Sequence, residues 1–122
     1  MIQAKELRIG NYLDAAGETE IVTEIYEDYF YTKSCKSTWA LIKPIPITKE
    51  WLIDFGCQYI DDHEYIIKDD LILENEYTDK GVWNFCTEHS WITEIKYIHQ
   101  LQNLYFAITG KELIKQKPAS NR

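Results

Sequence analysis

The stretch YIHQLQNLYFAITGKEL, residues 97–113, determines how the C-terminal part of this chain folds. Its apolar residues recur at the spacing of one helix face, i, i+4, i+7, i+8 and i+11. Gly110 follows as a stop, because glycine readily takes the left-handed conformation that ends a helix. The spacing therefore predicts a helix over about residues 97–109. The stripe expected to be buried consists of Tyr97, Leu101, Leu104, Tyr105 and Ile108.

The same stretch also carries polar side chains. His99 lies on the flank of the apolar stripe, and Gln100, Gln102 and Asn103 lie mostly off it. Since glutamine and asparagine are mostly exposed in folded proteins, we expect this face to be solvated. A bracing role for His99 and Gln100 at a neighbouring strand end stays open.

Upstream of this helix the chain is rich in short strand-like runs. TEIVTEIYE (19–27) alternates as a strand does, and the preceding DAAGE (14–18) is typical of a turn. LRIGNYL (7–13) predicts an extended lead-in followed by a strand. WALIKPIPI (39–47) is apolar and extended, because Pro44 and Pro46 exclude a helix there.

A second, shorter helix is predicted over about residues 48–55. Thr48 is a good N-cap, Glu50 favours the first turn, and Gly56 suits the position after the helix. From Cys57 onward, closely spaced strand-like runs and tight turns indicate an antiparallel meander. The predicted fold class is therefore α+β, with both helices packed on an antiparallel sheet. Residues 1–115 are expected to form a single domain and residues 116–122 a disordered tail.

Composition narrows the class of protein. The 122 residues fit one domain, and 45% hydrophobic content is far from the signature of disorder. Neither a run of about 18 apolar residues nor a secretory signal is present, so we expect a cytoplasmic protein without membrane contact. Cys35, Cys57 and Cys86 form no disulfide framework and are expected to be reduced, mostly core, thiols.

Motifs for catalysis are weak. Asp61-Asp62-His63-Glu64 and Asp69-Asp70 resemble metal or acid–base carboxylates, but they coincide with predicted hairpin turns, where Asp is favoured for local hydrogen bonding. Cys86-x-x-His89 is half of a zinc site without a second half at a recognised spacing. The sequence thus predicts no enzyme, no cofactor and no metal. Metal-dependent hydrolysis through residues 61–64 stays the minority alternative.

Charge is the unusual feature of the chain. The formal net charge is −7, which argues against direct nucleic-acid binding. Residues 50–80 alone hold ten acidic residues and two lysines, a net charge of −8. An acidic surface of this density suits a basic protein partner, although it also serves ordinary solubility.

Alternation along residues 26–31 further predicts one or two exposed tyrosines, which suit either an interface or an aromatic ladder on the sheet. The candidate partner-binding residues are Asp61, Asp62, Glu64, Asp69, Asp70, Glu74, Glu76, Asp79, Tyr29 and Tyr31.

Three segments resemble a family of small, mostly uncharacterised bacterial proteins carried by phages, prophages and other mobile elements. They are LRIGNYL (7–13), PIPITKEWLIDFG (44–56) and YIHQLQNLYFAITGKEL (97–113). The resemblance carries over no catalytic motif. In size and charge the chain is also similar to phage-borne inhibitors of bacterial immunity, the anti-CRISPR proteins.

The acidic segment, the lack of a catalytic motif and the mobile-element resemblance together predict a non-enzymatic, phage-encoded inhibitor acting in the host cytoplasm. Its partner would be a basic host protein, a CRISPR effector nuclease of the RNA-targeting type VI class, whose use of guide or target RNA it would block. The alternative is a phage or mobile-element accessory module with a housekeeping role, whose acidic face is only solvated. The oligomeric state stays open.

Overall fold

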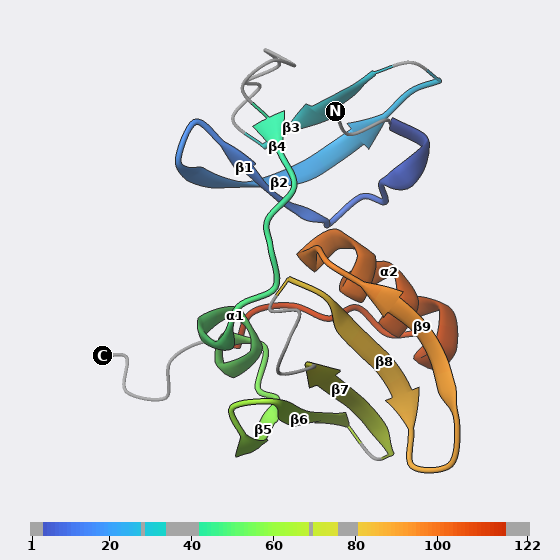
Figure 1. Cartoon of the computed structure of the whole chain (residues 1–122). Coiled ribbons are helices and arrows are strands. Elements are labelled where there is room, and N and C mark those ends of the chain that lie inside the picture. Colours follow the sequence, from blue (N-terminus) through green and yellow to red (C-terminus); the bar gives the residue numbers. More distant parts are fainter. Residues whose placement is uncertain (1–3, 28, 34–41, 69, 76–80, 117–122) are drawn as a thin grey trace. The chain divides into compact units, whose positions relative to one another are not determined.

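The computed structural model describes residues 4–27, 29–33, 42–68, 70–75 and 81–116 (Figure 1). Antiparallel sheets, one short helix and one C-terminal helix confirm the predicted α+β fold class. The chain divides into two compact units. The first unit holds residues 1–45 and 97–112, and the second holds residues 46–96 and 113–122.

The first unit is built on a four-stranded antiparallel sheet in the order β3-β2-β1-β4. Its core is formed by Leu7, Leu13, Ala15, Val22, Phe30 and Ile42. The C-terminal helix α2 contacts β1 of this sheet. The elements are η1 (Ala4–Glu6), β1 (Tyr12–Ala15), β2 (Glu18–Ile25), β3 (Phe30–Thr32), β4 (Ile42–Lys43) and α2 (Ile98–Thr109).

The turn between β1 and β2 follows from its two central residues. Ala16 and Gly17 have φ of 54° and 93°, and a two-residue hairpin of this kind needs positive φ at both positions. The Asp14 carboxylate accepts a hydrogen bond from the Gly17 N–H at 3.1 Å. This confirms the turn predicted at residues 14–18.

Helix α2 begins and ends where the sequence predicts. Tyr97 is the N-cap residue, and its N–H donates to the Gln100 side chain at 3.1 Å. Gly110 ends the helix with φ of 76°, and its N–H donates to the Phe106 carbonyl at 2.8 Å. Gln100 therefore braces the start of its own helix.

The buried face of α2 differs from the predicted stripe. Leu101 and Tyr105 are buried as predicted, and Tyr97 and Leu104 are half-buried. Ile108 is 47% exposed, so the prediction for this residue was wrong. His99 and Gln102 are each 1% exposed, so the prediction of a solvated polar face was wrong for these two residues. The buried residues of the helix are Ile98, His99, Leu101, Gln102 and Tyr105.

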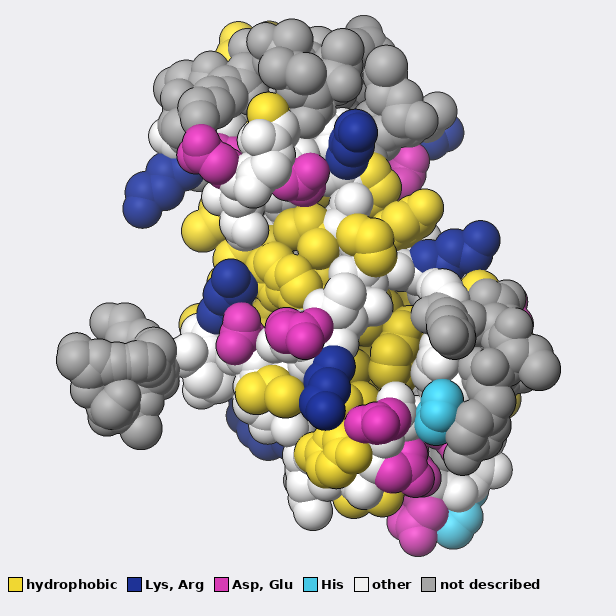
Figure 2. Space-filling view, turned by 60° about the vertical axis from the view of Figure 1, so that its left-hand side comes forward, with side chains coloured by type: hydrophobic (Ala, Val, Ile, Leu, Met, Phe, Trp, Pro, Cys, Tyr) yellow, Lys and Arg dark blue, Asp and Glu magenta, His cyan; other side chains and the backbone are white. Residues whose placement is uncertain are grey.

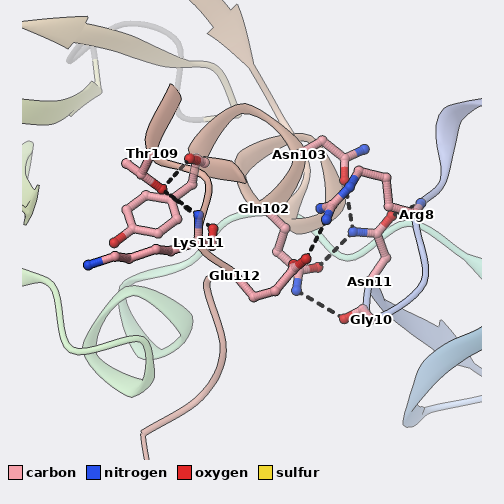
Figure 3. A network of polar contacts seen from close by, with 9 residues as sticks. Arg8, Gly10, Asn11, Gln102, Asn103, Thr109, Lys111 and Glu112 are labelled. Carbon is pink, nitrogen blue, oxygen red and sulfur yellow. Dashed lines mark hydrogen bonds and ion pairs between the residues drawn. The ribbon is translucent and has the colours of Figure 1, made fainter. Parts of the chain in front are cut away.

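Gln102 is buried because the backbone at the start of β1 and just before it offers partners for its amide (Figure 3). Its carbonyl oxygen accepts from the Tyr12 N–H at 2.9 Å, and its amino group donates to the Gly10 carbonyl at 3.1 Å. The Asn11 amino group donates to the side-chain oxygens of Asn103 at 2.9 Å and Gln102 at 3.3 Å. Buried polar groups are tolerated when they are hydrogen-bonded, and this network meets that condition.

The second unit carries a five-stranded antiparallel meander, and Figure 1 shows its strands following one another in chain order from β5 to β9. Before it lies α1 (Lys49–Asp54), where the Thr48 hydroxyl accepts from the Trp51 N–H and Gly56 has φ of 85°. Both end signals of this helix are confirmed. The strands are β5 (Gln58–Asp61), β6 (Glu64–Lys68), β7 (Leu71–Asn75), β8 (Trp83–Thr87) and β9 (Trp91–Ile95).

Several large residues of the second unit are fully buried. Tyr65, Leu73 and Phe85 are directly paired across β6, β7 and β8 and therefore share one face of the sheet. Cys57 and Cys86 are free and buried, as predicted, while Cys35 lies outside the described residues. No helix in the described ranges is long and apolar enough to span a membrane. The single domain over residues 1–115 and the disordered tail stay predictions.

Candidate protein-binding surface

The register of the five-stranded sheet brings acidic side chains from four strands into one line. Directly opposed residues of an antiparallel pair lie on the same face. Asp61 of β5 lies opposite Glu64 of β6, and Glu64 lies opposite Glu74 of β7. Asn84 of β8 lies between Glu74 and Glu94 of β9. We call Asp61, Glu64, Glu74, Asn84 and Glu94 the carboxylate row.

The carboxylate row is unfavourable for the sheet itself. Like charges directly opposite each other destabilise an antiparallel pair, and the row contains two such pairs, Asp61–Glu64 and Glu64–Glu74. Among the residues that the structure describes, no lysine, arginine or histidine forms an ion pair with the row. Within the described residues, the arrangement therefore places several carboxylates on one face without an ion pair.

A second line of residues on the same face is largely apolar. Ile66, Ile72, Cys86 and Trp91 are directly opposed across β6, β7, β8 and β9. We call these four the apolar row. Two contacts join it to the carboxylate row: the Trp91 indole N–H donates to Asn84 at 3.0 Å, and the Cys86 thiol lies 3.3 Å from a Glu74 carboxylate oxygen.

Trp91, like Glu94, belongs to this surface but was not predicted from the sequence. It is 60% exposed, the most exposed aromatic side chain among the described residues. Strict alternation along β9 would place Trp91 on the face of Thr93 and the buried Ile95. The register shifts between Phe85 and Cys86, so that Ile92 is an extra residue and Trp91 moves to the other face. A bulge of this kind has no clear sequence signal.

The turn between β5 and β6 uses its acidic residues for local structure. Asp61 accepts from the His63 N–H at 2.8 Å, which is the turn chemistry expected of aspartate. Asp62 accepts from the Tyr59 hydroxyl at 2.9 Å and lies 3.6 Å from the Lys49 ammonium. The Tyr59 hydrogen bond, followed by the Lys49 charge, lowers the pKa of Asp62. Asp62 is therefore already compensated, unlike the carboxylate row.

The other predicted acidic residues do not join the row. Asp70 is exposed in the turn between β6 and β7, at the opposite end of the sheet from Asp61. Asp69, Glu76 and Asp79 lie outside the described residues. On the face drawn in Figure 2, acidic side chains stand in small groups among lysine, histidine and hydrophobic side chains.

The two predicted tyrosines lie in the first unit, on the hairpin of β2 and β3. Glu24 is directly opposite Tyr31, and the Tyr26 N–H donates to the Tyr29 carbonyl at 2.8 Å, so these residues share one face. Tyr26 and Tyr29 are exposed, while Phe30 points to the core, which confirms the prediction of one or two exposed tyrosines. The rings of Tyr26 and Tyr29 stack at 4.7 Å, and that of Tyr31 is perpendicular to both. We call Tyr26, Tyr29 and Tyr31 the tyrosine cluster.

The two thiols that the structure describes, Cys57 and Cys86, show no activation for chemistry. Burial raises the pKa of Cys57 to about 12, and burial together with the Glu74 hydrogen bond and charge raises that of Cys86 to about 11. A nucleophilic cysteine needs a lowered pKa instead. The described part of the chain holds no group of three metal-ligating side chains. The absence of enzyme activity stays a prediction.

Comparison with known proteins does not extend this picture. No family model, curated protein or solved structure matches the chain. The functional argument therefore rests on the carboxylate row and the apolar row, and the tyrosine cluster is a separate surface.

Proposed function

We propose that this chain is a non-enzymatic, phage-encoded inhibitor that binds a basic surface of a host defence nuclease. The observation that carries the proposal is the carboxylate row, in which like charges oppose each other across β5, β6 and β7. Sequences that break a local stability rule without compensation tend to do so at functional sites. A cationic partner surface would relieve the repulsion that the isolated sheet carries.

The two rows have complementary roles in binding. Carboxylates on one face speed the encounter with a basic surface and fix its register, whereas exposed charge alone adds little affinity. Trp91 supplies the aromatic area that interfaces use as an anchor, and its position beside Asn84 and Cys86 places it next to both rows. Attraction would come from the carboxylate row and affinity from the apolar row.

The partner class follows from chemistry and from the resemblance. A nuclease that holds guide RNA and target RNA needs basic channels, and an acidic protein face competes for the same cations. The mobile-element resemblance and the net charge of −7 direct the proposal to a CRISPR effector, with the RNA-targeting type VI class first. Occupying the channel would interfere with guide or target RNA use.

A second candidate is a phage accessory module with a housekeeping role. It is favoured by the polar network of the first unit, because residues 7–13 and 97–113, two segments of the resemblance, use their polar side chains to hold each other. Residues that hold the fold together in this way indicate a shared fold rather than a shared activity. In this reading the carboxylate row is only solvated.

A pull-down separates the two candidates. The tagged chain is incubated with lysate containing CRISPR effectors and their guides, and washed at low and at high salt. Glu64→Lys/Glu74→Lys reverses the centre of the row, and Glu50→Lys/Glu88→Lys changes the net charge equally at exposed positions off the row. Trp91→Ala tests the apolar anchor.

The inhibitor predicts that an effector co-purifies at low salt and is lost at high salt, because exposed charge pairs are screened. Retention should fall at least about ten-fold for the row variant and stay within about two-fold for its control. If both charge variants retained the effector equally, the carboxylate row would not be the binding surface. Retention of phage proteins alone would favour the accessory module.

A further inference from the structure

The tyrosine cluster lies outside the surface used in the proposed function, and its surroundings indicate a ligand. From its geometry and charge we infer that Tyr26, Tyr29 and Tyr31 form a binding site for the guanidinium group of an arginine side chain. The inference rests on the proposed function only in that the arginine would belong to the basic protein partner.

The hairpin explains why the three rings come together. In the pairing of β2 with β3, Glu24 opposes Tyr31 and Ile25 opposes Phe30. The outward face therefore carries one carboxylate and three tyrosines, and the inward face carries the apolar residues. The perpendicular ring contacts measure 6.1 Å from Tyr26 to Tyr31 and 5.7 Å from Tyr29 to Tyr31. The Tyr26 hydroxyl donates to the Glu24 carboxylate at 2.6 Å, which fixes one ring beside an anion.

Three other aromatic rings in the described residues each have a cationic side chain over one face. The Arg8 guanidinium lies 3.9 Å from the centre of the Phe106 ring, the Lys49 ammonium 5.2 Å from that of Tyr59, and the Lys115 ammonium 4.2 Å from that of Trp51. These half-exposed or exposed rings each carry a cation from their own unit. Within the described residues, no lysine or arginine is placed over a ring of the tyrosine cluster.

Charge decides which ligand suits the cluster. The faces of aromatic rings carry negative potential and attract cations, and the Glu24 carboxylate adds to that attraction. A nucleic-acid base could also stack on tyrosine, but residues 14–30 hold six acidic residues and no basic one, which repels its phosphates. Arginine fits better than lysine because a planar guanidinium stacks on a ring face while it pairs with a carboxylate.

The inference is tested without any partner protein. Acetyl-arginine amide is titrated into the full chain while the NMR signals of the tyrosine rings are followed. Acetyl-citrulline amide, which has nearly the same shape but no charge, and acetyl-lysine amide are titrated in parallel. Tyr59, whose ring is already covered by Lys49, is the internal control.

The expected result is a saturable shift of the Tyr26, Tyr29 and Tyr31 signals with arginine, a smaller one with lysine, and none with citrulline. Tyr29→Phe should keep binding, and Tyr29→Leu should weaken it about two- to five-fold, the range of one exposed cation–π contact. Glu24→Gln should weaken it while leaving the amide signals of Val22 and Phe30, inside the hairpin, in place.

Equal responses to arginine and citrulline, or equal shifts at Tyr59, would overturn the inference. Because the titration uses no nuclease, this failure is distinct from that of the proposed function. Conversely, arginine binding by the tyrosine cluster would stand even if the carboxylate row retained no effector.

Discussion

The two units use polar residues in opposite ways. In the first unit, the amides of Asn11 and Gln102 are buried and that of Asn103 is half-buried, and each is hydrogen-bonded to the neighbouring segment. In the second unit, Glu64 and Glu74 are directly opposed on one sheet face, an arrangement of like charges that is unfavourable for an antiparallel pair. The amides stabilise the fold, whereas the carboxylates cost it stability. Residues that fold the chain and residues that bind a partner can therefore be separated by experiment.

The largest expected effect is at the buried amides. Gln102→Leu would leave the buried Tyr12 N–H and the half-buried Gly10 carbonyl without their side-chain partner. We expect the free energy of unfolding to fall by about 2–4 kcal/mol, since two polar groups shielded wholly or partly from water lose a hydrogen bond. Urea denaturation of both proteins measures this difference.

The control for this prediction is Gln58→Leu. Gln58 is exposed on the edge strand β5, so the same substitution should change stability by less than about 0.5 kcal/mol. A similarly small change for Gln102→Leu would show that the polar network does not hold the first unit together.

A second prediction concerns His99, which belongs to the same buried face. Burial lowers the pKa of His99 below its ordinary value of 6.5, and the Glu6 carboxylate, 3.6 Å away, only partly opposes that shift. The unfolded chain therefore binds a proton more readily than the folded chain. Stability from this residue is present above about pH 6.5 and is lost as the pH falls below that value.

Substitution isolates this pH dependence. His99→Phe keeps a ring that stacks on Tyr97 and removes the titrating group, so stability should fall less between about pH 7.5 and about pH 5.5. Denaturation midpoints at several pH values measure the slope. His89→Gln, at an exposed turn, should leave it unchanged. An unaltered slope in His99→Phe would contradict the assignment.

The fold follows closely from local sequence signals. Thr48 and Gly56 mark the ends of α1, Gly110 ends α2, and the short runs after Cys57 give the meander, because caps and turns depend on neighbouring residues. The buried face of α2 could not be predicted in this way. Its position depends on backbone groups about ninety residues earlier in the chain, which satisfy the amide of Gln102.

The candidate surface was only partly predictable for a similar reason. Composition revealed the acidic segment of residues 50–80, and alternation along residues 26–31 predicted the exposed tyrosines, yet strand register decides which carboxylates meet. Asp61, Glu64 and Glu74 are aligned with Glu94, which lay outside the predicted segment, while Asp70 is at the other end of the sheet. The face on which Trp91 lies depends on a bulge in β9. Strand pairing is set only in the folded sheet, and one extra residue in a strand moves the side chains beyond it to the other face.

A smaller effect is expected from neutralising the carboxylate row. Glu64→Gln removes both directly opposed pairs, so the free energy of unfolding should rise by about 0.2–1 kcal/mol at low salt. The gain should shrink in high salt because exposed charges are screened. Glu94→Gln is the matched control, since Glu94 lies opposite the neutral Asn84. If the two substitutions had equal effects, the row would carry no special repulsion.

The smallest expected effect is on the reactivity of Cys86, which reports the negative charge near the carboxylate row in the folded chain. The pKa of Cys86 is raised to about 11 by burial and, next, by its hydrogen bond with Glu74 and the charge of that carboxylate. Glu74→Gln should lower that pKa, so that Cys86 is alkylated by iodoacetamide somewhat faster at mildly alkaline pH. Mass spectrometry of the labelled peptides measures each cysteine separately. Cys57, whose pKa of about 12 is raised by burial alone, is the control within the same molecule.

If the alkylation of both thiols became faster, local opening of the second unit would explain the change. Acceleration of Cys86 alone would instead show that negative potential is concentrated at the centre of the row, where a basic partner would make contact.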